Sequence, residues 1–275
     1  MRLPVNIALG FLGVYVLLHS PAKAQSFDSQ HQRDIVANPS DLHFRIRTEG
    51  GVKAFHRGER IPLVLEFWSD SPNKHKLNGA TYDRGGRLLT EEFVLDRNDV
   101  ADPYADYFST GVLGGMTGGI RADPILDAKP HEIELDLNDW FRFDRPGAYR
   151  LYLKSHRLRR ERNPGEKGEK TIYFAAVSNV LEVAILPDDP VWTETKLRAI
   201  ESVLVESEPE TPKPSGPLVF MNPPDERLRS ARRDLCYLAT PAVLPLAFRD
   251  ARKSGRSPDT WLLIGSRDRE QTVIA

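Results

Sequence analysis

LNDWFRFDRPGAYRL, residues 137–151, is the stretch of this sequence that says most about the fold. From Tyr149 onward apolar residues alternate with polar ones, which indicates a β-strand with one buried face and one exposed face. Arg145-Pro146-Gly147 comes directly before that strand and has the composition of a tight turn. The stretch therefore predicts a turn followed by a half-buried strand.

The same alternation recurs on both sides of this stretch. Its apolar members are Leu42, Phe44 and Ile46; Ile61, Leu63, Leu65 and Phe67; Ile133, Leu135 and Leu137; and Tyr149, Leu151 and Leu153, with a last run from Val177 to Leu186. Turn sequences such as Gly50-Gly51 and Asp83-Arg84-Gly85-Gly86 separate the runs. Five or more short strands of this kind predict an antiparallel β-sandwich over residues 41–187.

The pattern of Asp144, Gly147 and Tyr149 resembles the corner of immunoglobulin-like sandwiches. In that corner a tyrosine hydroxyl bonds to nearby backbone and fixes the turn between two strands. The resemblance implies structural roles for these three residues. The cysteine that often lies two positions after the tyrosine is replaced here by Leu151. Trp140 is expected to fill the core.

Residues 188–275 carry patterns that predict helices, with a linker between them. Asp188-Asp189-Pro190 offers an N-cap and a proline in the first turn, and the apolar spacing after it predicts a helix over residues 188–204. Residues 205–224 are rich in proline and glutamate and are expected to form a linker. Residues 225–275 again carry apolar residues at helical spacing, and we expect several short helices there.

LCYLATPAVLPLA, residues 235–247, resembles the junction between two helices of a HEAT repeat. Residues 261–270 resemble a weaker second copy, although the spacing is short of the usual HEAT period of ~40 residues. The whole layout, with YDRGGRL at 82–88 and VSNV at 177–180, resembles bacterial exported proteins in which an immunoglobulin-like β-sandwich precedes HEAT-like helical repeats. The predicted fold class is mainly β plus α: an N-terminal immunoglobulin-like antiparallel β-sandwich and a C-terminal α-helical, HEAT-like segment.

Residues 1–24 read as a cleavable secretory signal peptide. Arg2 is followed by an apolar, uncharged run from Val5 to Leu18, and Ala22-Lys23-Ala24 forms an A-x-A cleavage site before Gln25. The run is shorter than the ~20 residues of a membrane span, although an uncleaved anchor is the alternative. We therefore expect an exported protein, periplasmic or extracellular, with no transmembrane segment after cleavage. Residues 25–40 are polar without periodicity and are expected to form a loose N-terminal arm.

Charge and cysteine content limit the partners and the compartment. The chain has a formal charge of −1, and removing Arg2 and Lys23 with the signal peptide leaves −3. A near-neutral chain lacks the basic footprint of a nucleic-acid-binding protein. Cys236 is the single cysteine, so the fold is expected to depend on a packed core rather than on a disulfide. These features favour a bacterial periplasm, with a protein or another envelope component as the partner.

Residues 96–102 hold the one candidate metal site. Calcium prefers oxygen ligands, and this run clusters four side chains that carry them, but the spacing of an EF-hand is missing and a solvated loop is the favoured interpretation. The weak calcium candidates are Asp96, Asn98, Asp99 and Asp102. The sequence shows no zinc motif and no nucleophile motif, so we expect no cofactor and name no catalytic residue.

The leading hypothesis for function is a non-catalytic binding or scaffolding protein of the bacterial cell envelope, because sandwiches and helical arrays both present extended surfaces. One alternative is an envelope or extracellular hydrolase of glycans or peptides, which needs carboxylates or a metal converging in a cleft. Another alternative is that the chain is a truncated fragment of a longer helical-repeat protein, because Val273-Ile274-Ala275 ends it on apolar residues at helical spacing.

Overall fold

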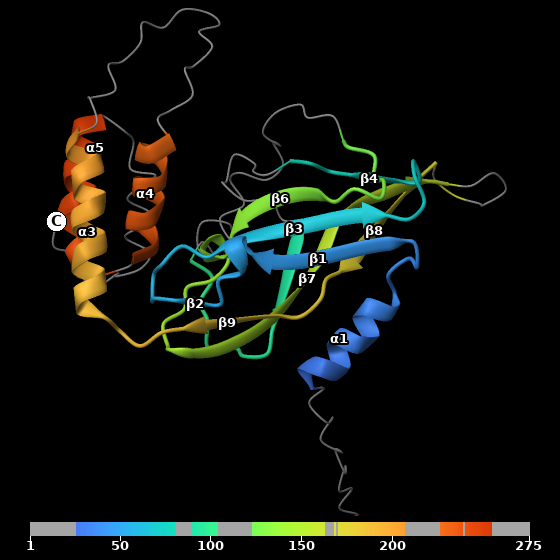
Figure 1. Ribbon diagram of the computed structural model, residues 1–275, viewed down its shortest axis with the longest axis horizontal. Helices are drawn as coiled ribbons and strands as arrows, with labels where there is room; N and C mark the ends of the chain where they lie inside the picture. The colour runs from blue at the N-terminus through green and yellow to red at the C-terminus, as the bar shows by residue number, and fades with distance from the viewer. Residues whose placement is uncertain are drawn as a thin grey trace, which may run out of the picture.

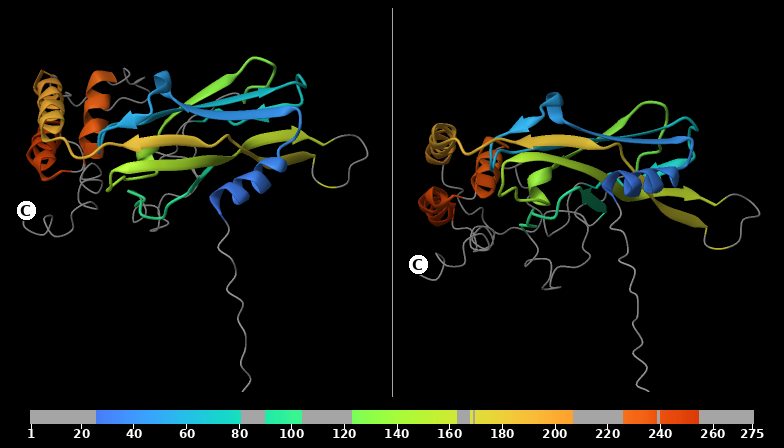
Figure 2. Two further views of the ribbon diagram at one scale, coloured as in Figure 1. Left: turned by 60° about the horizontal axis from the view of Figure 1, so that its bottom comes forward. Right: turned by 90° about the horizontal axis from the view of Figure 1, so that it is seen from below.

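The computed structural model of the chain describes residues 26–80, 90–103, 123–162, 168, 170–206, 226–238 and 240–254 (Figure 1). The predicted signal peptide, most of the predicted linker, and the stretches 82–88 and 261–270 lie outside these residues. In the described part, two β-sheets lie against each other. Helices α3, α4 and α5 stand together at one end of the sheets, whereas α1 lies away from them (Figures 1 and 2).

The first sheet has three antiparallel strands in the order β1-β3-β6. Strand β1 is Leu42–Thr48, β3 is Pro62–Ser69 and β6 is His131–Asp136. Arg45 pairs with Glu66 and Glu66 pairs with Glu132, so that these three residues form one row across the sheet. The alternation read from the sequence places Phe44, Ile46 and their neighbours on the inner face, and the charged residues between them on the outer face.

The second sheet is built around β7, Gly147–Glu161, which is 15 residues long. Its order is β2-β9-β7-β4, and β5 and β8 also pair with β7. The strands are β2 (Ala54–Phe55), β4 (His75–Leu77), β5 (Glu91–Leu95), β8 (Thr171–Val177) and β9 (Leu181–Ile185). Strand β2 runs parallel to β9, and the other pairings of this sheet are antiparallel.

The inner faces of both sheets share one hydrophobic core. It contains Phe44, Ile46, Leu63, Leu65, Phe67, Ile133 and Leu135 from the first sheet, and Tyr149, Leu151, Leu153, Leu158, Val183 and Ile185 from the second. One ion pair is buried beside it, because Arg157 and Glu91 both have fully buried side chains and bond to each other. Arg157 also donates to the carbonyl oxygen of Asn78 at 3.0 Å. A buried pair of this kind is tolerated because its hydrogen bonds are satisfied.

The helices at the end of the sheets form a second core. They are α3 (Pro190–Glu206), α4 (Glu226–Leu238) and α5 (Leu244–Ser254), and 3₁₀ turns lie at Glu49–Gly51, Leu137–Asp139 and Pro241–Val243. Asp189 caps α3 as predicted, because its carboxylate accepts from the backbone N–H of Trp192 at 3.0 Å. The buried members of this core are Ile200, Leu204, Leu228, Ala231, Leu235, Leu238, Val243, Leu246 and Ala247. No helix in the described ranges is both long enough and apolar enough to cross a membrane.

The predicted fold class is wrong. The chain is a mixed α/β protein with two sheets, and the described residues form four α-helices, one of them ahead of the first strand. The parallel pairing of β2 with β9 departs from an antiparallel sandwich. In the described residues from 226 onward a HEAT-like segment is not evident, because α4 and α5 are short and pack with α3 in one cluster. Their apolar residues are used in that cluster rather than in stacked repeats.

The expectation of a loose arm over residues 25–40 is also corrected. Helix α1 spans Phe27–Val36, and the Ser26 side chain caps it by accepting from the backbone N–H of Ser29. The helix buries no residue of its own, so it shows no apolar periodicity in the sequence. It is held by polar and aromatic contacts: Asp34 accepts from the hydroxyl of Tyr152 at 2.6 Å and pairs with Lys154 at 2.8 Å. The Phe27 ring also lies against the Tyr152 ring, with 5.4 Å between centroids.

Candidate functional site

The seam between the sheets and helix α4 is organised around Asp136, the last residue of β6. Its side chain is only 1% exposed and pairs with Arg60 and with Arg233 of α4, each at 2.6 Å. Burial disfavours the charge on Arg60, but the hydrogen bond and the attraction of Asp136 outweigh it and raise the pKa of Arg60. One buried carboxylate thus joins two segments that are far apart in the sequence.

Tyr237, in the last turn of α4, adds a second contact to this seam. Its hydroxyl donates to Asp139 at 2.6 Å and lies 3.4 Å from Asp136. Helix α3 is attached nearby, because the Trp192 ring stacks on His56 with 4.5 Å between centroids, and Arg57 pairs with Asp188 at 2.9 Å. The helices are therefore docked on the sheets through specific polar and aromatic contacts.

A small polar pocket of about 130 Å³ opens at this seam. Its lining includes Arg57, Gly58, Asn138, Arg142, Asp144 and Tyr237. Asp144 is held by Arg142, whose Nε lies 2.9 Å from it. Asp144 is the carboxylate that lines the pocket, whereas Asp136 is outside the lining and is paired with Arg60 and Arg233.

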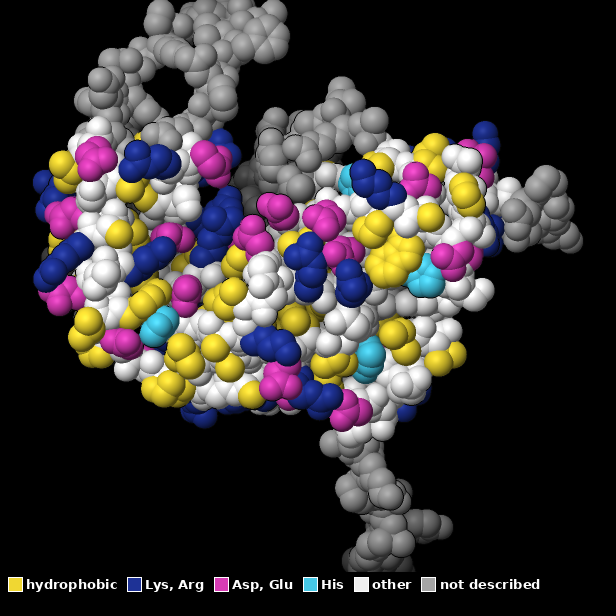
Figure 3. All heavy atoms as spheres, viewed as in Figure 1, with side chains coloured by type: hydrophobic (Ala, Val, Ile, Leu, Met, Phe, Trp, Pro, Cys, Tyr) yellow, Lys and Arg dark blue, Asp and Glu magenta, His cyan; other side chains and the backbone are white. Residues whose placement is uncertain are grey.

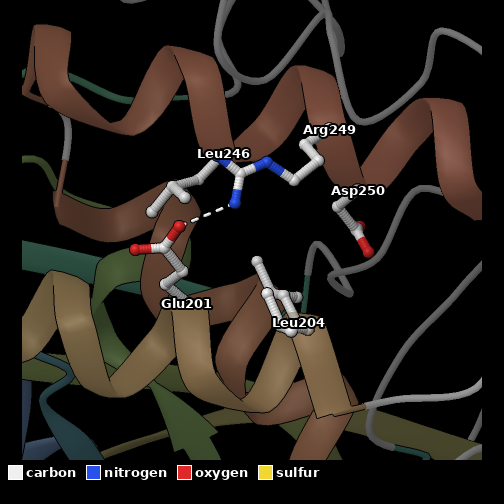
Figure 4. Close-up of a pocket in the computed structure, with 6 residues that line it drawn as sticks. Glu201, Leu204, Leu246, Arg249 and Asp250 are labelled. Carbon is white, nitrogen blue, oxygen red and sulfur yellow. Dashed lines mark hydrogen bonds and ion pairs between the residues drawn. The ribbon is translucent and has the colours of Figure 1, made fainter.

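A second pocket, of about 230 Å³, lies between α3 and α5 (Figure 4). Leu204, Val205 and Leu246 contribute its apolar lining. Glu201 and Arg249 point toward each other across it and form an ion pair at 2.6 Å. This pocket is a gap between two packed helices that is closed on one side by an ion pair.

Tyr149 and Trp140, two of the residues predicted to be structural, both belong to the core between the sheets. The Tyr149 hydroxyl donates to the backbone oxygen of Arg145 at 2.7 Å, which is a bond to nearby backbone of the kind the corner pattern implies. Gly147 adopts φ of +139°, a conformation that favours glycine. The guanidinium of Arg97 covers the Tyr149 ring at 4.3 Å. Trp140 is 8% exposed and packs in the core against Phe93, as expected for a core residue.

The calcium candidates are used in contacts within the chain. Asp96 accepts from the backbone N–H of Arg150 at 3.1 Å. Asp99 pairs with Arg97, with 2.9 Å between the carboxylate and Nε, and this hydrogen bond lowers the pKa of Asp99. Asn98 and Asp102 belong to the same loop, yet the described residues contain no group of three or more His, Cys, Asp or Glu side chains that could hold a metal ion.

The outer face of the β1-β3-β6 sheet is the surface that sequence reasoning missed. Trp68 on β3 is stacked with His43 of β1, with ring centroids 5.0 Å apart and planes 14° apart. The guanidinium of Arg45 lies 5.9 Å from the centre of the Trp68 ring. His43 in turn bonds to Asp70 at 2.7 Å. The Trp68 ring is thus in contact with an imidazole ring and a guanidinium on the outside of a sheet.

Ion pairs continue along this outer face. Glu66 pairs with Arg45 at 2.5 Å and with Arg47 at 2.8 Å, and Arg47 reaches Glu132 at 3.0 Å. Burial would raise the pKa of Glu66, but the hydrogen bonds from the two arginines hold it below its ordinary value. The Arg45 and Glu132 side chains remain 55% and 50% exposed. Figure 3 shows basic, acidic and histidine side chains gathered over the region of β1 and β3.

The sequence did carry a signal for this surface. The residues between the apolar members of β1 are His43, Arg45 and Arg47, and the even-numbered members of β3 include Glu66 and Trp68. A tryptophan at an outward position of a half-buried strand indicates a contact surface rather than a core. The register that aligns these residues in rows is visible only in the structure.

No known protein-family model matches the chain, and comparison with curated proteins finds no significant match.

Proposed function

We propose that this protein is an exported, non-catalytic binding or scaffolding protein of the bacterial cell envelope, and that it binds through the outer face of the β1-β3-β6 sheet. The observation that carries the proposal is the contact of Trp68 with both His43 and Arg45 on that face. Export is supported by the signal-peptide pattern of residues 1–24.

The chemistry of this face supports binding. Tryptophan and arginine are the residues that contribute most strongly to protein interfaces, because they combine a large apolar area with directional hydrogen bonding. Glu66 holds the guanidinium groups of Arg45 and Arg47 in place, so that less side-chain entropy is lost when a partner binds. The strands beneath are rigid, since their opposite face forms the core.

The same face already binds a helix at one end. Asp136 follows Glu132 and Glu134 at alternate positions of β6, so all three belong to the outer face. Arg233 of α4 pairs with Asp136. An arginine from another segment therefore meets an acid of this column inside the chain. Glu132 is already reached by Arg47 of β1, and the exposed Glu134 offers the same chemistry to an arginine of a partner.

Photo-crosslinking in the cells that make the protein tests this proposal. A photoreactive residue at Asp70, which is next to His43 and has a 64% exposed side chain, should give a discrete crosslinked product. The product should disappear when Trp68→Ala is added. A matched position on the other sheet is Tyr173, which is 66% exposed. The proposal fails if the Asp70 position gives no product, or only the products that the Tyr173 position gives.

A further inference from the structure

We infer that the partner of this face is a second copy of the chain, packed face to face about a twofold axis that runs along β3. This inference rests on the proposed function and names the partner of the same site. The inference is drawn from the distribution of charge on the outer face. When two copies of this face are stacked, opposite charges meet in one relative orientation of the copies and like charges meet in the other.

The outer face has a basic edge and an acidic edge. Arg45 and Arg47 lie on β1, and Glu132 and Glu134 lie on β6, with β3 between the two strands. The rows are in register, because Arg45 and Glu132 both align with Glu66, and Arg47 and Glu134 both align with Val64. Each arginine therefore has a glutamate two strands away in its own row.

A twofold axis along β3 exchanges the two edges and keeps the rows. It places β1 of one copy over β6 of the other, so that Arg45 faces Glu132 and Arg47 faces Glu134, and each contact occurs twice. An axis perpendicular to the strands would instead place β1 over β1 and β6 over β6. Like charges would then meet along both edges, which is unfavourable. Electrostatics thus selects one of the two ways of stacking the sheets.

The centre of the face is also compatible with this arrangement. Trp68 lies on β3, so each copy brings its Trp68 ring to the other across the axis, and aromatic pairs are favourable contacts at interfaces. Glu66 also lies on β3, but it is only 4% exposed and its carboxylate is already bonded to two arginines. Repulsion between the two Glu66 carboxylates is reduced by those cations.

The small area of the face limits the affinity of the dimer. Three strands about 4.8 Å apart and roughly 20 Å long give a contact on the order of 300 Å² per copy. Stable interfaces bury about 800 Å² per partner, so we expect a weak dimer with a dissociation constant in the micromolar range or above. Because its contacts are exposed ion pairs, the dimer should weaken as salt increases.

Charge reversal combined with sedimentation analysis tests the inference on the purified mature chain. The wild type should dimerise with rising concentration up to about 200 μM. Arg45→Glu and Glu132→Arg should each raise the dissociation constant at least ~10-fold, because like charges then meet twice. An equimolar mixture of the two variants, and the double variant in one chain, should both recover the dimer. Glu194→Arg on α3 is the control and should leave the dimer unchanged.

A cysteine-crosslinking readout covers the case in which Arg45→Glu fails to fold. Asp70 follows the last residue of β3 and lies close to the proposed axis, so two Asp70→Cys chains should be joined by a bismaleimide reagent that spans the gap of about 10 Å between stacked sheets. Glu194→Cys is the matched exposed position and should join much more slowly. A wild type that stays monomeric to about 200 μM, together with equal joining rates, overturns the inference. If Asp70 crosslinks to a different envelope protein in cells and Trp68→Ala abolishes this, the proposed function stands without the dimer.

Discussion

A Cβ atom added to Gly58 would lie 2.8 Å from the Cα of Leu238 and 2.9 Å from the backbone oxygen of Tyr237. The turn after β2 therefore touches the backbone at the end of α4, and only a residue without a side chain allows this approach. Gly58 also adopts φ of +80°, which favours glycine. Together with the ion pairs of Asp136, this contact fixes the helices on the sheets.

Gly58→Ala should destabilise the protein by about 2 kcal/mol or more, because the strained φ and the contact with backbone both oppose a methyl group. Gly50→Ala is a matched control, since Gly50 has φ of +63° and nothing within 4 Å of its added Cβ. It should cost only about 1 kcal/mol. Urea unfolding measures both, and equal losses would show that the close approach to α4 is not important.

Asp136→Asn should cost about 1–2 kcal/mol, because it removes a buried carboxylate from two arginines that are themselves partly exposed to water. Glu194→Gln breaks an exposed ion pair with Arg198 on α3 and should cost less than about 0.5 kcal/mol. Unfolding in urea distinguishes the two variants. A loss at Asp136 as small as that at Glu194 would contradict the structural importance of the seam.

Tyr149→Phe should cost about 1 kcal/mol, because the hydroxyl loses its hydrogen bond to the Arg145 carbonyl while the ring remains buried. Tyr173→Phe, at an exposed tyrosine of β8, is the control and should leave the melting temperature unchanged. An unchanged melting temperature for Tyr149→Phe as well would count against the role of this corner.

The stability that α1 gains from its contacts with β7 should depend on pH. Partial burial raises the pKa of Asp34, but hydrogen bonds from Lys154 and Tyr152 outweigh it, so the pKa lies below the ordinary 3.8. A depressed pKa gives stability that is present above pH 3.8 and is lost as the pH falls through the folded-state value. Asp34→Asn should therefore cost about 1 kcal/mol at pH 6 and less at pH 3, which lies below the ordinary pKa of 3.8. An equal cost at both pH values in urea unfolding would rule out this linkage.

The strands could be predicted from the sequence because their signal is local. Alternation of apolar and polar residues marks β1, β3, β6 and β7 within single runs of the chain. Helix α1 could not be predicted in this way, since it buries no residue and is held by contacts of Phe27, Asp28 and Asp34 with strand β7, which is far away in the sequence. The HEAT-like expectation failed because helical spacing shows which face is buried but not which element covers it.

The binding surface depends on contacts that no local pattern contains. Asp136 and Arg233 are 97 positions apart, and Arg47 and Glu132 are 85 positions apart. Trp68 comes directly after the apolar run that ends at Phe67, and only its pairing opposite His43 shows that it lies on the outer face. Register across the sheet is a tertiary property, so the rows of charge emerge only when the strands are paired.

Hydroxyl-radical footprinting of Trp68 tests the binding role of the β1-β3-β6 face most directly. The oxidation rate of Trp68 should be several-fold lower in intact cells than in the dilute purified protein, because the partner covers it. Tyr173 on the other sheet serves as the internal reference and should be oxidised at the same relative rate in both samples. Equal relative rates for Trp68 in cells and in dilute solution would contradict the proposal that this face is a binding surface.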